Sequence, residues 1–70
     1  MSTWGACKAS RVLRALQNIG WSIKRQTGSH RTLAKYGEQD YVFSFHDGDE
    51  IGPAMLAKIA KKTGLKPEDL

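Results

Sequence analysis

The spacing of apolar residues changes twice along this chain, and this change constrains the fold more than any other feature. Over residues 9–20 apolar side chains recur every three or four positions, which predicts an amphipathic helix. Over residues 21–45 they alternate with polar ones, which predicts strands joined by short turns. Helical spacing returns over residues 53–64. The order predicts an α+β fold, αβββα, in which both helices cover one face of a three-stranded antiparallel sheet.

Both predicted helices have recognisable ends. Ser10 is the expected N-cap of the first helix, and Gly20 supplies the left-handed residue that commonly ends one. Pro53 suits the first turn of the second helix, and Gly64 is expected to end it. The apolar stripe of the first helix is predicted to contain Val12, Leu13, Leu16 and Ile19.

The predicted strands separate a core side from a polar side. An aromatic row, Tyr41, Phe43 and Phe45, is expected to pack inward together with Trp21. These rings could stack on bases, but their alternation with polar residues favours the core. Most outward positions of the first two strands are polar or cationic, so the uncovered face is a candidate binding surface. Its expected members include Lys24, Gln26 and Thr32.

The N-terminal residues are expected to stand apart from the domain. Residues 1–8 show no periodicity and are predicted to form a loose lead-in to a single domain over residues 9–70. Trp4 is the exception, because a large aromatic ring there is able to fold back onto the domain. A chain of this length buries only about 60% of its unfolded surface, so its stability margin is thin.

The charge balance indicates an acidic partner. Lys and Arg number 11 and Asp and Glu 7, which gives a formal net charge of +4 at pH 7. Charge alone leaves nucleic acid, a membrane surface and an acidic protein open. No apolar run approaches the ~20 residues of a membrane span and no leader pattern is visible, so no membrane association is expected. The single Cys7 cannot form an internal disulfide, which fits a reducing cytoplasm.

Gly28-Ser29-His30 is the stretch with the clearest chemical potential, and it falls between the first and second predicted strands. Imidazole is the side chain that titrates near neutral pH, so His30 is a candidate general acid or base. Histidine also occurs in turns, where it hydrogen-bonds a backbone group. Spacing alone favours that second interpretation for His30.

Several short pieces of sequence occur together in an order and spacing typical of one family. In order they are Gly20-Trp21, Arg25-Gln26-x-Gly28-Ser29-His30, His46, Glu50-Ile51-x-Pro53, Leu56 and Gly64-Leu65. On these pieces the chain resembles the HicA family of small toxins from toxin–antitoxin pairs. The resemblance runs from about Ser10 to Leu70 and implies a double-stranded-RNA-binding-like fold.

The resemblance implies a ribonuclease that cleaves messenger RNA without a metal or other cofactor, with His30 as the catalytic residue. In that chemistry His30 removes the proton of a ribose 2′-hydroxyl, whose oxygen attacks the adjacent phosphorus. Gly28 and Ser29 offer backbone N–H groups and a hydroxyl to grip a phosphate. The nearby cations for the developing phosphorane charge are Lys24, Arg25 and Arg31. A HicB-like antitoxin that covers the site is also implied.

His46 and the loop that follows it allow two further interpretations. His46 is a candidate second acid that protonates the leaving 5′-oxygen, or a residue that only ends a strand and orders the loop. The carboxylates of Asp47, Asp49 and Glu50 raise the question of a magnesium site. Asp-Gly-Asp is common in turns and the calcium-loop pattern is incomplete, so no metal is predicted.

Two other functions use the same features. One is a non-catalytic RNA-binding module on the same basic surface, and the other is a protein-binding domain whose positive charge serves an acidic partner. The helix cations fit either a solvated face or phosphate contacts, and the charge pattern leaves both open. They are Arg11, Arg14, Lys58, Lys61 and Lys62.

Overall fold

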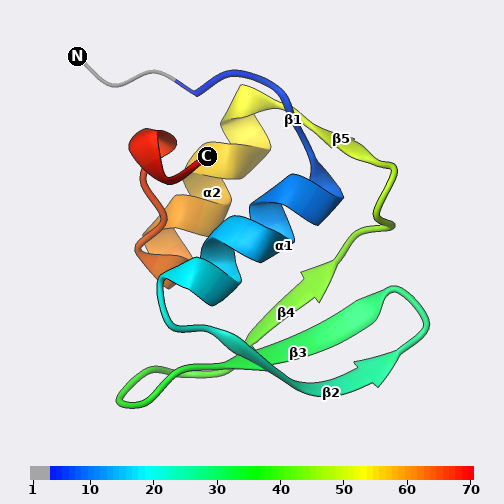
Figure 1. The fold of residues 1–70 in the computed structure, drawn as a ribbon, viewed down its shortest axis with the longest axis vertical. Helices are drawn as coiled ribbons and strands as arrows, with labels where there is room; N and C mark the ends of the chain where they lie inside the picture. The colour runs from blue at the N-terminus through cyan, green and yellow to red at the C-terminus, as the bar shows by residue number, and fades with distance from the viewer. Residues whose placement is uncertain (1–3) are drawn as a thin grey trace.

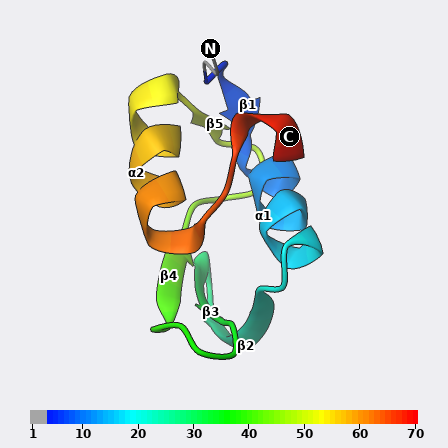
Figure 2. The same ribbon diagram turned by 90° about the vertical axis from the view of Figure 1, so that its left-hand side faces the viewer.

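Two helices cover one face of a three-stranded antiparallel sheet in the computed structural model, which describes residues 4–70 (Figure 1). The main elements are α1 (Ala9–Asn18), β2 (Ser22–Thr27), β3 (His30–Ala34), β4 (Tyr41–Ser44) and α2 (Pro53–Thr63). The sheet order is β2-β3-β4, and both helices lie on the same side of it (Figure 2). The predicted α+β fold is confirmed. No helix in the described part of the chain is long and apolar enough to cross a membrane.

A second, very small sheet joins the segment before α1 to the segment before α2. Strand β1 (Cys7–Lys8) pairs antiparallel with β5 (Glu50–Ile51). Strands of two residues are too short for alternation to be visible, so the sequence predicted a lead-in and a polar loop in their place. Trp4 packs against the core, in line with its predicted return to the domain. Residues 1–3 of the predicted lead-in lie outside the described residues.

The start of α1 is capped by the backbone rather than by a side chain. The helix begins at Ala9, after Lys8, and no side chain bonds its first turn, so the prediction of Ser10 as N-cap is wrong. Instead the N–H of Ala9 donates to the carbonyl oxygen of Asp49 at 2.8 Å. The N–H of Ser10 donates to the carbonyl oxygen of Asp47 at 3.2 Å. The loop after β4 thereby satisfies helix donors that otherwise need a capping side chain.

The other predicted helix ends are confirmed. Gly20 follows α1 with a φ of 109°, and Gly64 ends α2 with a φ of 79°, both in the left-handed region that favours glycine. Pro53 is the first residue of α2. A short 3-10 turn, η1 (Pro67–Asp69), follows α2.

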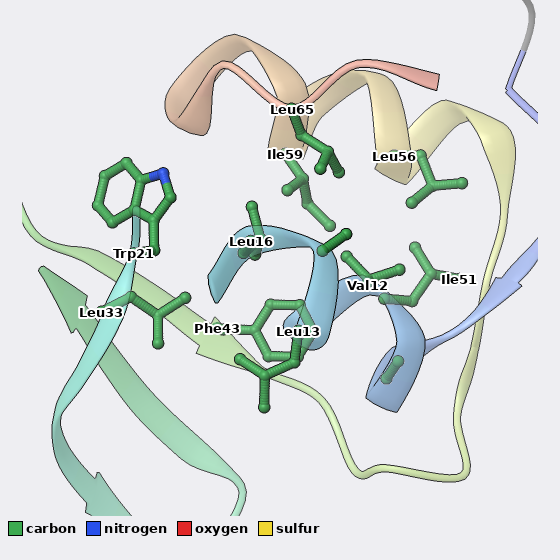
Figure 3. Close-up of a cluster of buried hydrophobic side chains, with 12 residues drawn as sticks. Val12, Leu13, Leu16, Trp21, Leu33, Phe43, Ile51, Leu56, Ile59 and Leu65 are labelled. Atoms are coloured by element: carbon green, nitrogen blue, oxygen red, sulfur yellow. The ribbon is translucent and has the colours of Figure 1, made fainter. Parts of the chain in front are cut away.

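The core lies between the helices and the inner face of the sheet (Figure 3). Phe43 is 0% exposed and belongs to the same buried cluster as Leu13 of α1 (Figure 3). The indole N–H of Trp21 donates to the carbonyl oxygen of Thr63 at 3.0 Å and ties the start of β2 to the end of α2. Tyr41 and Phe45 are partly buried against the core, so the predicted aromatic row is confirmed. Fully buried aliphatic side chains fill the remainder: Val12, Leu16, Leu33, Ile51, Leu56 and Ile59.

A β-bulge in β2 changes which residues face outward. Ile23 pairs with Leu33, but the next pair in register is Arg25 with Thr32, which leaves Lys24 as an extra residue. Paired residues share a face, and one extra residue moves all later side chains to the opposite face. The sequence predicted unbroken alternation.

Gln26 is the residue whose predicted orientation is wrong. It pairs with Arg31, which lies two positions before buried Leu33 on β3 and therefore shares its helix-facing side. Arg25 moves to the uncovered face instead. Because of the bulge, the uncovered face of the sheet carries the guanidinium of Arg25 in place of the neutral amide of Gln26.

Candidate functional site

The face of the sheet that the helices leave uncovered is mostly polar. The strand register places one cation, Arg25, on it. We call it the open face, and its members are Ser22, Arg25, Thr27, His30, Thr32, Ala34, Val42 and Ser44. His30 begins β3 and lies directly between two hydroxyl residues, Thr27 on β2 and Ser44 on β4. Opposed residues have Cβ atoms about 5 Å apart, so these hydroxyls border the imidazole.

A two-residue turn holds His30 at its position. Thr27 and His30 close the β2–β3 hairpin, and only Gly28 and Ser29 lie between them. Gly28 has a φ of 60° while Ser29 does not enter the left-handed region, which is the pattern of a type II′ turn. The side-chain amide of Gln26 donates to the carbonyl oxygen of Gly28 at 3.1 Å and braces the turn.

The imidazole of His30 is exposed and unengaged. None of the side-chain hydrogen bonds or ion pairs formed within residues 4–70 involves it. The alternative of a turn histidine bonded to a backbone group is therefore not the arrangement in this structure. The exposed ring is therefore available to a ligand.

Arg25 is the free cation beside His30. Its pairing partner, Thr32, lies two residues from His30, so the two side chains are diagonal neighbours on the open face. Diagonal neighbours are about 7–8 Å apart at their Cβ atoms, within reach of an arginine. Among the described residues no carboxylate pairs with Arg25. A phosphate beside His30 is within range of this guanidinium.

The other two predicted cations are engaged by carboxylates. Lys24, at the bulge, donates to Oδ2 of Asp40 at 2.9 Å in an exposed pair. Arg31 points to the opposite side of the sheet, where its Nη2 donates to Oδ1 of Asp47 at 2.9 Å. The Arg31 side chain is only 12% exposed, and its Nη1 is buried with no partner in residues 4–70. The structure does not bring Arg31 onto the face of His30.

Asp47 belongs to a tight turn that follows β4. The N–H of Asp49 donates to the carbonyl oxygen of His46 at 2.9 Å, and the N–H of His46 donates to Oδ2 of Asp49 at 3.0 Å. Within the described range no three His, Cys, Asp or Glu side chains gather as metal ligands would. The carboxylates of Asp47 and Asp49 instead bond to the protein's own donors. His46 is exposed and lies two residues, or roughly 7 Å of extended chain, past the residue opposite His30.

Replacing Arg31 is expected to destabilise the fold, whereas replacing Arg25 is not. Arg31→Gln removes a largely buried guanidinium and its charge-assisted bond to the exposed carboxylate of Asp47, and we expect a loss of about 1 kcal/mol in unfolding free energy. Arg25→Gln makes the same charge change at an unpaired site and should stay within about 0.5 kcal/mol of wild type. Urea denaturation measures both. Equal losses in the two variants would contradict the assignment of Arg31 to the loop.

Thr27 and Ser44 were not among the site residues predicted from the sequence. A two-residue Gly-Ser turn indicates that its flanking residues pair, so Thr27 opposite His30 could have been inferred. Ser44 depends on the register between β3 and β4, which are joined by a six-residue connection (residues 35–40), and no local signal sets it. The pairing of Arg31 with Asp47 had no sequence signal either.

A groove lies at the opposite end of β4 from His30. It is lined by residues 38–42 and by Lys61 and Lys62 of α2. Burial raises the pKa of the Tyr41 phenol in this groove above its ordinary value of 10.0, so the phenol is neutral at neutral pH. The groove contains acidic side chains as well as lysines and holds none of the predicted catalytic residues.

Comparison with known protein families matches residues 9–65 of the 70-residue chain to the family described as "HicA toxin of bacterial toxin-antitoxin". Comparison with curated proteins and with solved structures finds no match. The matched range contains both helices and the whole three-stranded sheet, and therefore the open face. Toxins of this kind pair with an antitoxin. The chain therefore belongs to the family of HicA toxins of bacterial toxin–antitoxin systems.

Proposed function

We propose that this toxin is a metal-independent endoribonuclease that cleaves messenger RNA, with His30 as its general base. The observation that carries the proposal is an exposed, unbonded imidazole on a polar face, next to an unpaired arginine. Membership of a toxin family supports an activity such as RNA cleavage, and a net charge of +4 supports a polyanionic substrate. No cofactor is needed for the chemistry below.

The reaction moves one proton at each end of a phosphoryl transfer. A neutral ring nitrogen of His30 takes the proton of a ribose 2′-hydroxyl as the 2′-oxygen forms a bond to the adjacent phosphorus. The bond from phosphorus to the 5′-oxygen breaks, and that oxygen takes a proton from an acid. The products are a 2′,3′-cyclic phosphate and a 5′-hydroxyl end. His46, exposed past the end of β4, is our candidate for the acid.

Negative charge on the pentacoordinate phosphorus requires donors close to His30. Arg25 is the nearest free guanidinium by register, and the Gly28-Ser29 turn supplies N–H groups and a hydroxyl. Lys24 contributes once a phosphate displaces Asp40 from it, which is possible because exposed ion pairs are weak. Arg31 contributes indirectly by holding the loop that contains His46.

We also propose that the antitoxin is a HicB-like protein that inhibits the toxin by covering the open face. Its contact surface is expected to be acidic, in complement to the net positive charge of the toxin. Covering the face would exclude RNA from His30 and Arg25 at the same time.

The test is cleavage of a defined RNA by the purified toxin in excess EDTA. We expect cutting to continue in EDTA and the upstream product to end in a 2′,3′-cyclic phosphate. RNA binding without cutting would instead favour the non-catalytic RNA-binding module. No RNA retention even at low salt, where phosphate contacts are strongest, would favour the protein-binding domain.

A further inference from the structure

The exposed face of α1 carries two arginines. Arg11 and Arg14 are exposed, and no ion pair within residues 4–70 involves either of them, whereas Lys8, just before the helix, lies opposite Glu50 in the β1–β5 ladder. Ser10, Arg11 and Arg14 together line a shallow surface hollow. A surface with two arginines that no carboxylate pairs with is complementary to a chain of phosphates.

This cationic surface adjoins the loop next to the catalytic face. The N–H of Ser10 bonds to the carbonyl oxygen of Asp47, and the carboxylate of Asp47 bonds to Arg31, the neighbour of His30. Figure 1 shows the start of α1 beside the loop that runs from β4 to β5. Only the His46–Asp49 turn therefore separates the end of the open face from the first turn of α1.

The acids of this turn are engaged in ways that reduce their repulsion of RNA. Asp47 forms a 2.9 Å ion pair with Arg31, which offsets part of its negative charge. The carboxylate of Asp49 accepts the N–H of His46 and is thereby held within the turn. A polyanion that leaves the His30 site in this direction meets the paired Asp47 and the hydrogen-bonded Asp49. Glu50, which follows them, lies opposite Lys8, and the arginines of α1 come next.

The cations of α2 do not offer an equivalent path. Lys61 and Lys62 line the groove at the start of β4, together with Glu38 and Asp40. His30 pairs with Ser44 at the other end of that strand, about three residues or roughly 10 Å away. Acidic residues accompany these lysines, whereas none lines the hollow on α1.

We propose that the RNA continues from His30 across the His46–Asp49 turn, and that Arg11 and Arg14 bind phosphates flanking the cleaved one. The identity of the ligand rests on the proposed function. The arginines hold the substrate without touching the reacting atoms, so they act on binding and leave the chemical step unchanged. Substrates too short to reach α1 gain nothing from them.

The experiment compares Arg11→Gln/Arg14→Gln with the matched control Lys61→Gln/Lys62→Gln, which removes the same charge from α2. A 12-nucleotide RNA spans roughly 41 Å at 3.4 Å per phosphate, more than the 33 Å longest dimension of the protein. For this RNA we expect the arginine variant to raise KM roughly tenfold at unchanged kcat. For a dinucleotide, which has one phosphate, both parameters should equal wild type. The lysine control should match wild type on both substrates.

Binding of a 2′-O-methyl 12-nucleotide RNA gives a readout that does not need cleavage, so it separates this inference from the proposed function. The dependence of log affinity on log salt should weaken by about 1.4 in the arginine variant, since each single-strand contact contributes about 0.7. Equal effects of the arginine and lysine variants would overturn the inference. So would tighter binding of a 12-residue oligoglutamate than of the RNA, because the surface would then fit an acidic protein segment.

Discussion

His30→Ala is expected to lower the rate of RNA cleavage by roughly 100- to 10,000-fold, the usual contribution of a general base. The side chain is exposed at the start of β3 and bonds to no described residue, so its removal should leave the fold intact. RNA affinity should also persist, because Arg25 and the Gly28-Ser29 turn are unchanged. Single-turnover cleavage, thermal melting and binding of 2′-O-methyl RNA measure these three properties separately.

Thr32→Ala is a suitable control for this variant, since it removes a polar side chain from the same strand and the same face. It should cut RNA at a rate close to wild type. A His30→Ala protein that cuts equally well would show that another group is the base. His46→Ala addresses the proton donor: a large loss in the rate with intact folding supports His46, and an unchanged rate assigns that proton to water.

Phe43→Ala is expected to have the largest effect on stability, about 3–5 kcal/mol in unfolding free energy. The ring is 0% exposed between the sheet and α1, and it contacts Phe45 edge-to-face with centroids 5.1 Å apart. A domain of this length has roughly 3.5–10 kcal/mol of stability in total, so this loss is a large fraction of it. Circular dichroism during urea denaturation measures the loss.

The matched control for the core is Val42→Ala, one residue earlier on the same strand. Val42 is 51% exposed on the open face, and its truncation should cost less than about 1 kcal/mol. Similar losses at the two positions would contradict the arrangement in which odd-numbered residues of β4 face the helices.

Features set by local spacing could be predicted from the sequence. Val12, Leu13 and Leu16 recur with helical period and are buried, while Ile19, at the end of the same stripe, is only partly buried. Gly64 ends α2 because a left-handed residue is needed there. The turn at Gly28-Ser29 was also predicted, although His30, expected between the two strands, is the first residue of β3.

Features that depend on register or on distant contacts could not be predicted. The bulge at Lys24 has no local signature, yet it places Arg25 on the face of His30. Ser10 was expected to cap α1, but backbone carbonyls of a loop 37 or more residues away meet the first N–H groups instead. In the sequence Arg31 is a cation next to the candidate catalytic residue, and only the fold shows that it pairs with Asp47. Each of these features depends on contacts between residues that are distant in the sequence.

The central claim is that His30 acts on a ribose 2′-hydroxyl, and one measurement tests it most directly. The substrate is a 12-nucleotide strand of deoxyribose that contains a single ribose, incubated with wild-type toxin and with His30→Ala in EDTA. We predict that the wild type cuts only on the 3′ side of that ribose, leaving a 2′,3′-cyclic phosphate, and that His30→Ala leaves the strand intact. Cutting at a deoxyribose, or equal cutting by both proteins, would contradict the claim.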